Sequence, residues 1–159
     1  MSNVVFYALV VILTYIGMEF VAWASHRYLM HGVLWCWHED HHKSKYEKEG
    51  FFEKNDLFFI VFAIPSMCSY ICGSLFPEYR WLLYVGIGIS LYGLTYFLIH
   101  DVYIHQRFKW FKQLDGWYSR AILRAHGEHH AVRTKHGCES FGLLVVEGKH
   151  FKKRPKKTT

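Results

Sequence analysis

Histidine is the residue type in this 159-residue chain whose number and spacing could do chemistry. Imidazole nitrogen binds iron, zinc, copper and nickel, whereas magnesium and calcium prefer oxygen ligands. A structural zinc site closes with four ligands, and ten of the twelve histidines here lie in four short clusters. The repeated order of a loose pair and a tight triplet predicts two metal ions, with iron reacting with dioxygen as the natural candidate. The clusters are His26 and His31; His38, His41 and His42; His100 and His105; and His126, His129 and His130.

The spacing within each cluster suggests how its side chains face an ion. Each triplet has i, i+3, i+4 spacing, which places its members on one face of an α-helix. The members of a pair are five residues apart, about 140° around an ideal α-helix, so they do not easily chelate one ion. We expect His100 and His105 to give one ligand to each of two ions, and His26 and His31 to straddle a helix end near Gly32.

Two acidic residues near the clusters are candidates for supporting roles. Asp101 directly follows His100, and we expect its carboxylate to accept the second N–H of a metal-bound imidazole without binding the ion itself. Glu19 lies seven residues before His26, inside an apolar run. An acid in such a run either belongs to a functional site or bonds a neighbouring helix as a protonated carboxyl, and both interpretations stay open.

Aromatic residues lead up to the histidines from within the apolar runs. Tyr92 and Tyr96 form a stripe with His100 at four-residue spacing, and Trp23 lies one turn before His26. These residues, together with Glu19, could line a channel for an apolar substrate. The alternative is helix packing and anchoring at the membrane interface.

Three long apolar runs, at residues 4–24, 57–76 and 81–99, must position these groups. Each is long enough to cross a hydrocarbon core of about 30 Å as a helix. We therefore expect an all-α integral membrane bundle with a histidine-rich helical lobe, and a further interfacial helix is compatible with it. The first run lacks a basic start and reads as a retained span. Residues 141–146 could dip into the interface but are too short to span.

Charge predicts the orientation of the bundle. Eighteen of the 19 Lys and Arg residues lie between Arg27 and Lys54 or after His105, and only Arg80 lies in the short turn between the last two runs. The positive-inside rule therefore places all four clusters on the cytoplasmic face of the cytoplasmic membrane. Residues 1–147 form one membrane domain. Residues 148–159 read as a basic, disordered tail near lipid headgroups, with His150 in it binding nothing and with no role in nucleic-acid binding.

The motifs closely resemble the fatty acid hydroxylase superfamily of membrane di-iron oxygenases, and within it the bacterial β-carotene 3-hydroxylases. The resemblance covers nearly the whole chain except the basic tail, and His136 lies outside the four-cluster pattern. The runs that carry it are HRYLMHG at 26–32, WHEDHH at 37–42, HDVYIHQR at 100–107, AHGEHHAVR at 125–133 and GCESFG at 137–142.

The resemblance implies hydroxylation of the 3-position of β-ionone rings in carotenoid biosynthesis, taking β-carotene to β-cryptoxanthin and then to zeaxanthin. It implies two non-haem iron ions held by the ten histidines, dioxygen as oxidant and an external reduced ferredoxin as electron donor. A carotenoid substrate would enter from the bilayer, and the basic face could receive an acidic ferredoxin. A homo-oligomer is compatible with the sequence.

Other activities remain open on the sequence alone. Ring 4-ketolation and fatty acid or sterol hydroxylation use related di-iron chemistry. A membrane metal carrier would need ligands along its spans, and Glu19 is the only carboxylate in the three apolar runs, which contain no histidine.

Overall fold

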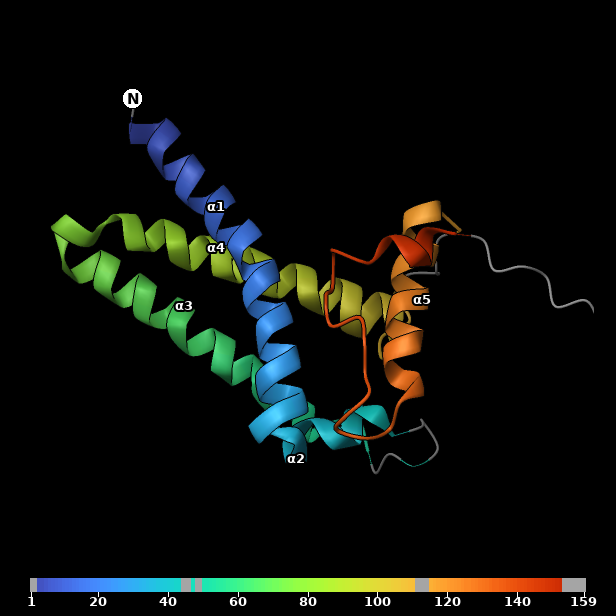
Figure 1. Ribbon diagram of the computed structural model, residues 1–159. Helices are drawn as coiled ribbons and strands as arrows, with labels where there is room; N and C mark the ends of the chain where they lie inside the picture. The colour runs from blue at the N-terminus through green and yellow to red at the C-terminus, as the bar shows by residue number, and fades with distance from the viewer. Residues whose placement is uncertain (1–2, 44–46, 48–49, 111–114, 153–159) are drawn as a thin grey trace, which may run out of the picture.

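The computed structural model describes residues 3–43, 47, 50–110 and 115–152, and this part of the chain is helical with no β-strand. Three long helical segments form the bundle, and short helices and loops form a lobe at one end (Figure 1). The α-helices are α1 (Asn3–Ala24), α2 (Trp35–His38), α3 (Phe58–Leu75), α4 (Trp81–Tyr96) and α5 (Trp117–Ala131). Two segments are π-helical, η1 (Ser25–Val33) and η5 (Phe97–Ile104). Four short segments are 3₁₀-helical: η2 (Glu39–His42), η3 (Lys54–Leu57), η4 (Pro77–Tyr79) and η6 (Gly148–Phe151).

Three continuous segments are long and apolar enough to cross a membrane: Asn3–Val33, Lys54–Leu75 and Trp81–Ile104. Large apolar side chains remain exposed along them, including Val4 at 77%, Phe20 at 68% and Phe59 at 77%. Such exposure is unfavourable in water but suits contact with lipid chains. The predicted all-α fold with three apolar spans is therefore confirmed.

α4 is the central helix of the bundle and packs against both α1 and α3. Small residues permit these close approaches, as is usual between membrane helices. A Cβ added at Gly88 would lie 2.7 Å from Thr14 Cβ on α1, and one at Gly73 would lie 2.7 Å from the backbone nitrogen of Leu83 on α4. α1 and α3 make few contacts with each other, so the bundle is open between them.

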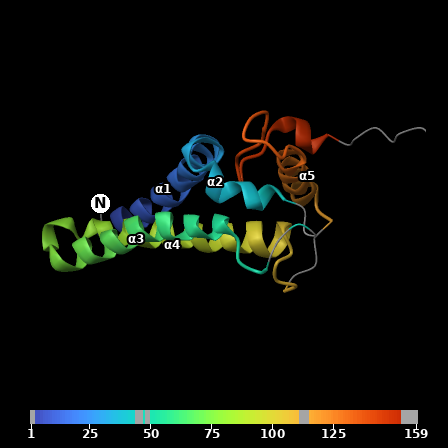
Figure 2. The same ribbon diagram turned by 90° about the horizontal axis from the view of Figure 1, so that it is seen from below.

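The histidine-bearing lobe lies at the end of the bundle away from the N-terminus and from the turn that joins α3 to α4 (Figures 1 and 2). α1 and α4 both run toward this end and continue into it as η1 and η5. α2 and η2 follow from α1, and α5 lies across the outside of the lobe. The topology therefore gathers all four histidine clusters at one end, as the order of the apolar runs predicts.

The segment after residue 147 differs in part from the expected solvated tail. Gly148–Phe151 forms the short helix η6, which packs against α5. His150 is only 4% exposed, and one of its ring nitrogens lies 3.0 Å from Ser140 Oγ. The expectation that His150 belongs to a solvated tail is wrong, because the Phe151 ring of η6 packs against the Trp117 and Tyr118 rings of α5. The tail at 153–159 lies outside the described residues.

Candidate metal centre

The two histidine pairs lie on π-helical segments, η1 and η5. In such a segment the backbone hydrogen bonds join residues five apart, as from His105 N–H to His100 O at 2.9 Å. This wider turn brings i and i+5 to the same side of the helix. The rings of His100 and His105 lie 4.5 Å apart, and those of His26 and His31 lie 5.4 Å apart.

The expectation that His100 and His105 serve different ions is therefore wrong, because it assumed an α-helix. Both belong to one group of converging nitrogens, and His26 and His31 both belong to another. The expected break near Gly32 is present, since its backbone (φ −118°, ψ −117°) leaves the helical region. Both histidines of that pair precede the break, so the expectation that they straddle a helix end is wrong, because the π-helical turn already brings them to one side of η1.

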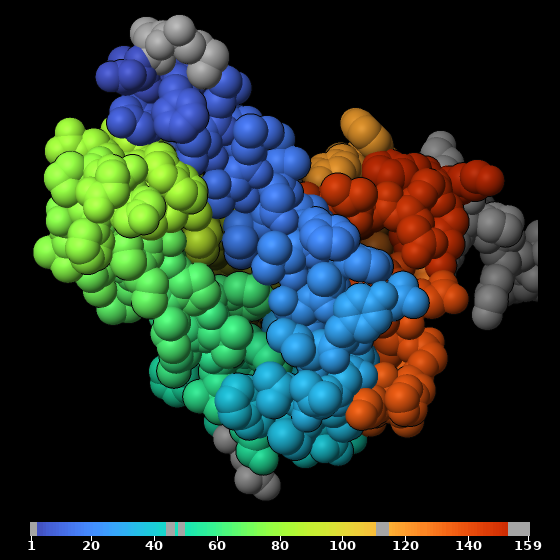
Figure 3. Space-filling view, turned by 60° about the vertical axis from the view of Figure 1, so that its left-hand side comes forward, coloured from blue at the N-terminus to red at the C-terminus, as the bar shows by residue number. Residues whose placement is uncertain are grey.

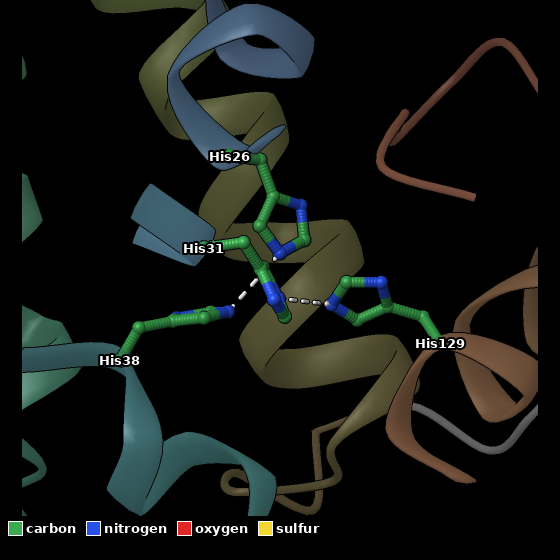
Figure 4. A group of neighbouring side chains, drawn as sticks. All are labelled: His26, His31, His38 and His129. Atoms are coloured by element: carbon green, nitrogen blue, oxygen red, sulfur yellow. Dashed lines mark hydrogen bonds between the residues drawn. The ribbon is translucent and has the colours of Figure 1, made fainter. Parts of the chain in front are cut away.

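Eight histidines form two groups in which the potential ligand atoms lie within 4.8 Å of one another. Each triplet divides its members between the two groups, so a single ion site draws on three of the four clusters. The first histidine group, drawn in Figure 4, contains His26, His31, His38 and His129. The second histidine group contains His41, His100, His105 and His126.

The remaining two cluster histidines lie between these groups. His42 Nε2 is 3.2 Å from Nε2 of His38 in the first group. The ring of His42 stacks on that of His130 at 4.6 Å, and the His130 ring lies 4.4 Å from that of His126 in the second group. The structure thus brings all ten predicted ligands together, and His130 Nε2 is buried without a hydrogen-bond partner among the described residues.

Six of these rings have the same orientation, with Nδ1 directed outward to an oxygen acceptor and Nε2 directed toward another histidine. The Nδ1 acceptors are Phe141 O for His26 (3.0 Å), Lys135 O for His31 (3.2 Å), Asn55 Oδ1 for His38 (2.6 Å), Glu53 Oε2 for His41 (2.7 Å), Val132 O for His42 (2.8 Å) and Glu139 O for His129 (2.9 Å). Because these oxygens only accept, each Nδ1 carries the proton and each Nε2 presents a lone pair.

Lone pairs then face each other inside the first histidine group. His26 Nε2 lies 3.1 Å from His38 Nε2, and His31 Nε2 lies 3.1 Å from His129 Nε2 (Figure 4). Burial lowers the pKa of His38 to about 2 and that of His129 to about 3, so protonation does not relieve this opposition at neutral pH. A bound cation would relieve it, and neutral imidazoles with oriented Nδ1–H groups are the donor set that a transition metal prefers.

Sequence reasoning missed two of the residues that orient the rings, Glu53 and Asn55. Glu53 caps the start of η3 and Asn55 lies within it, and neither is near a histidine in the chain. Asp101, the predicted supporting acid, has Oδ2 3.6 Å from His100 Nδ1, longer than a hydrogen bond. Its Oδ1 accepts a hydrogen bond from Arg107 at 3.0 Å, and Arg107 also bonds Asp56 at 2.7 Å, which ties η5 to η3.

The loop after α5 forms a belt, residues 132–145, around the first histidine group. Four of its carbonyls are the Nδ1 acceptors of His42, His31, His129 and His26. Ser140, at φ +62°, lies between two of these acceptors and turns the chain so that both carbonyls face inward. The GCESFG run at 137–142, which carried part of the family resemblance, therefore supplies two of the ring acceptors and the turn between them.

The belt ends on Glu19 of α1. Its Oε1 accepts hydrogen bonds from the backbone N–H groups of Leu143, Leu144 and Val145 at 2.9–3.0 Å, and its Oε2 accepts one from the Tyr92 hydroxyl at 2.7 Å. Both carboxylate oxygens of Glu19 therefore accept hydrogen bonds, and these bonds come from the belt and from α4, not from a histidine.

A cavity of about 540 Å³ leads from the opening between α1 and α3 to the histidines. Figure 3 looks toward this opening, between the blue atoms of α1 and the green atoms of α3. Its walls are mostly apolar and include the predicted channel residues Tyr92 and Tyr96, and its inner end reaches both histidine groups. Trp23 and Glu19, also predicted for the channel, do not line this cavity and instead border a separate hollow on the other side of the belt.

His136 and Cys138 are two further potential metal ligands in the belt. His136 lies in neither histidine group of the described residues, and its carbonyl accepts a hydrogen bond from Thr134 Oγ1. Cys138 Sγ forms a third candidate group with His31, His42 and His129, in which the ligand atoms lie within 4.8 Å of one another. Its S–H is, however, directed at backbone oxygens, 3.6 Å from His129 O and 3.7 Å from Val132 O. Burial raises the pKa of this thiol, which favours the protonated form.

Comparisons with known proteins agree with this arrangement. The fatty acid hydroxylase family model matches residues 11–147. The β-carotene hydroxylase of Pantoea ananas is 43% identical over 141 residues, covering 87% of this chain and 77% of that protein, and the one from Paracoccus sp. (strain N81106 / MBIC 01143) is 37% identical over 139 residues, covering 87% and 83%. The chloroplastic β-carotene 3-hydroxylase of Gentiana lutea is 38% identical over 134 residues, covering 82% of this chain and 40% of that protein. No solved structure matches the chain. The chain belongs to the fatty acid hydroxylase family.

Proposed function

We propose that this protein is a membrane non-haem di-iron oxygenase that hydroxylates the 3-position of β-ionone rings, converting β-carotene to β-cryptoxanthin and then to zeaxanthin. The observation that carries the proposal is the apolar cavity that opens between α1 and α3 and ends on both histidine groups. The names of the relatives, β-carotene hydroxylase in bacteria and β-carotene 3-hydroxylase in a plant, supply the substrate and the ring position.

The ten clustered histidines would hold two iron ions, His26, His31, His38 and His129 around one and His41, His100, His105 and His126 around the other, with His42 and His130 between them. When bound, the iron pair supplies the activation of dioxygen, one atom of which enters the substrate while external electrons reduce the other to water. The oxygen acceptors behind six of these rings keep their Nδ1 atoms protonated and their Nε2 atoms directed inward.

The cavity would place one ring of the substrate beside the histidines. Tyr96 stacks on His100 with ring centroids 4.7 Å apart, so it continues the wall from the apolar part of the cavity to the metal centre. Apolar walls favour an apolar ring and exclude water, which limits side oxidation. The rest of a rod-like carotenoid would extend through the opening between α1 and α3 into the bilayer.

The orientation and the electron donor are further parts of the proposal. The concentration of basic residues at the histidine end supports a location in the cytoplasmic membrane with the metal centre on the cytoplasmic side. A reduced ferredoxin-type protein, acidic at its docking face, would supply the electrons at this basic surface. Reduction rates that do not change with salt or with Lys-to-Glu reversal would contradict such docking.

The experiment that tests the function is pigment chromatography of β-carotene-accumulating cells that express the chain or its His129→Ala variant. Zeaxanthin and β-cryptoxanthin should appear only with the intact protein. Unchanged β-carotene, with the protein present in the membrane and a ferredoxin supplied, would refute the substrate assignment. A ring ketone would keep the oxygenase chemistry and refute the 3-hydroxylation.

A further inference from the structure

The two histidine groups differ in the chemistry of the oxygens behind their rings. In the first histidine group, every Nδ1 acceptor is neutral: three are backbone carbonyls, of Phe141, Lys135 and Glu139, and one is the side-chain amide oxygen of Asn55. His42, which adjoins this group, also donates to a carbonyl, that of Val132.

The second histidine group has one carboxylate in the corresponding place and another close by. His41 Nδ1 donates to Glu53 Oε2 at 2.7 Å, and the two side chains are 1% and 7% exposed. Asp101 lies 3.6 Å from His100 Nδ1, and its side chain is 16% exposed. The Glu53 contact is the shorter of the two and its carboxylate is the more buried, so it is the stronger contact.

A carboxylate behind a metal-bound imidazole acts differently from a carbonyl. Both orient the ring, but the carboxylate also makes the ring a more basic ligand and adds negative charge near the ion. Burial increases this effect, because the interaction is screened less in the protein interior than in water. Two sites with otherwise similar imidazole ligands should therefore differ in affinity for a cation.

We propose that the two metal sites are inequivalent. Glu53, acting through His41, gives the site of the second histidine group the higher affinity for a divalent cation, and its negative charge also stabilises an ion of higher charge there. Glu53 is a positioning residue, since it touches His41 and not the ion. The inference rests on the proposed two-metal function and adds to it a distinction between the two sites.

Cobalt(II) titration of the purified, metal-free protein in detergent tests this inference through the visible absorption of each bound ion. The wild type should show two binding steps of different affinity. Single-site variants assign them: His100→Ala should remove the tight step, and His26→Ala should remove the weak one. Glu53→Gln keeps an oxygen acceptor for His41 Nδ1 and removes only the charge, so it should weaken the tight step by roughly 10- to 100-fold.

Asn55→Asp is the matched control, because it introduces a carboxylate behind His38 at the same position. It should strengthen the weak step and leave the tight step unchanged. Equal affinities in the wild type, or a Glu53→Gln protein with unchanged binding steps, would overturn the inference. If the wild type had equal affinities at both sites and still converted β-carotene to zeaxanthin, the proposed function would stand without the distinction between the sites. If the wild type instead bound cobalt in two unequal steps but did not hydroxylate β-carotene, the distinction between the sites would stand and the proposed function would fail.

Discussion

The Tyr92 hydroxyl donates a 2.7 Å hydrogen bond to Glu19 Oε2, which joins α4 to α1 within two of the candidate membrane spans. The other carboxylate oxygen of Glu19 accepts three backbone N–H groups from residues 143–145. One acid therefore links two spans to the belt that orients the first histidine group. Glu19 therefore bonds a neighbouring helix, as one of the two interpretations expected, but it does so as an acceptor and not as a protonated donor, and it does not line the substrate cavity.

Glu19→Ala should lower both the stability and the iron content of the protein, because it leaves three N–H groups and a buried hydroxyl without their acceptor. The expected loss is at least about 3 kcal/mol of unfolding free energy, against about 1–2 kcal/mol for Tyr92→Phe, which loses one bond. Glu19→Gln should be intermediate, since its amide oxygen can still accept from the belt. Thermal unfolding in detergent and iron analysis measure these effects. Unchanged values in Glu19→Ala would show that other contacts hold the belt.

Replacement of a clustered histidine should abolish hydroxylation, whereas replacement of His136 should not. His129→Ala removes an Nε2 from the first histidine group, so we expect at most about 1% of wild-type product together with reduced iron content. His136→Ala is the control, because His136 lies in neither group of the described residues. Pigment chromatography and iron analysis of both variants provide the comparison. Equal losses in the two variants would contradict the assignment of ligands.

Ala22→Phe should block the substrate cavity without disturbing the metal centre. Ala22 is 9% exposed and lines the cavity, so a phenyl group there would occupy space that we assign to the substrate. We expect product formation to fall by at least about tenfold while iron content stays at the wild-type level. Val21→Phe is the matched control, since Val21 is 42% exposed on the adjacent position of α1. Normal turnover in Ala22→Phe would place the substrate elsewhere.

Gly88→Ala should weaken the contact between α1 and α4. The added Cβ would lie 2.7 Å from Thr14 Cβ and 2.9 Å from Val11 O, so the helices must separate, at a cost of about 1–3 kcal/mol. Gly17→Ala, where nothing lies within 4 Å of the new Cβ, should be neutral or stabilising by up to about 1 kcal/mol. Thermal unfolding of both variants compares them. A stable Gly88→Ala protein would indicate that this crossing is looser than the structure shows.

The sequence by itself determined the fold class and the chemical nature of the site. Continuous apolar runs of this length cross a bilayer as helices, because a helix satisfies every backbone polar group within the segment. The order of these runs places the four clusters at one end, and the choice of imidazole as ligand predicts a transition metal. These conclusions depend on composition and order along the chain, which need no knowledge of contacts.

Only the tertiary structure decided how the histidines are shared and what orients them. The pairing of His100 with His105 depends on a π-helical turn, a local geometry that i, i+5 spacing alone does not reveal. Glu53 reaches His41, and the Glu139 carbonyl reaches His129, only after distant segments have folded against each other. A backbone carbonyl is present in every residue, so no residue type marks it as an acceptor. A single acidic residue such as Glu53 cannot be distinguished in the sequence from one that is exposed to solvent. Such partners are defined by position in space, which folding alone supplies.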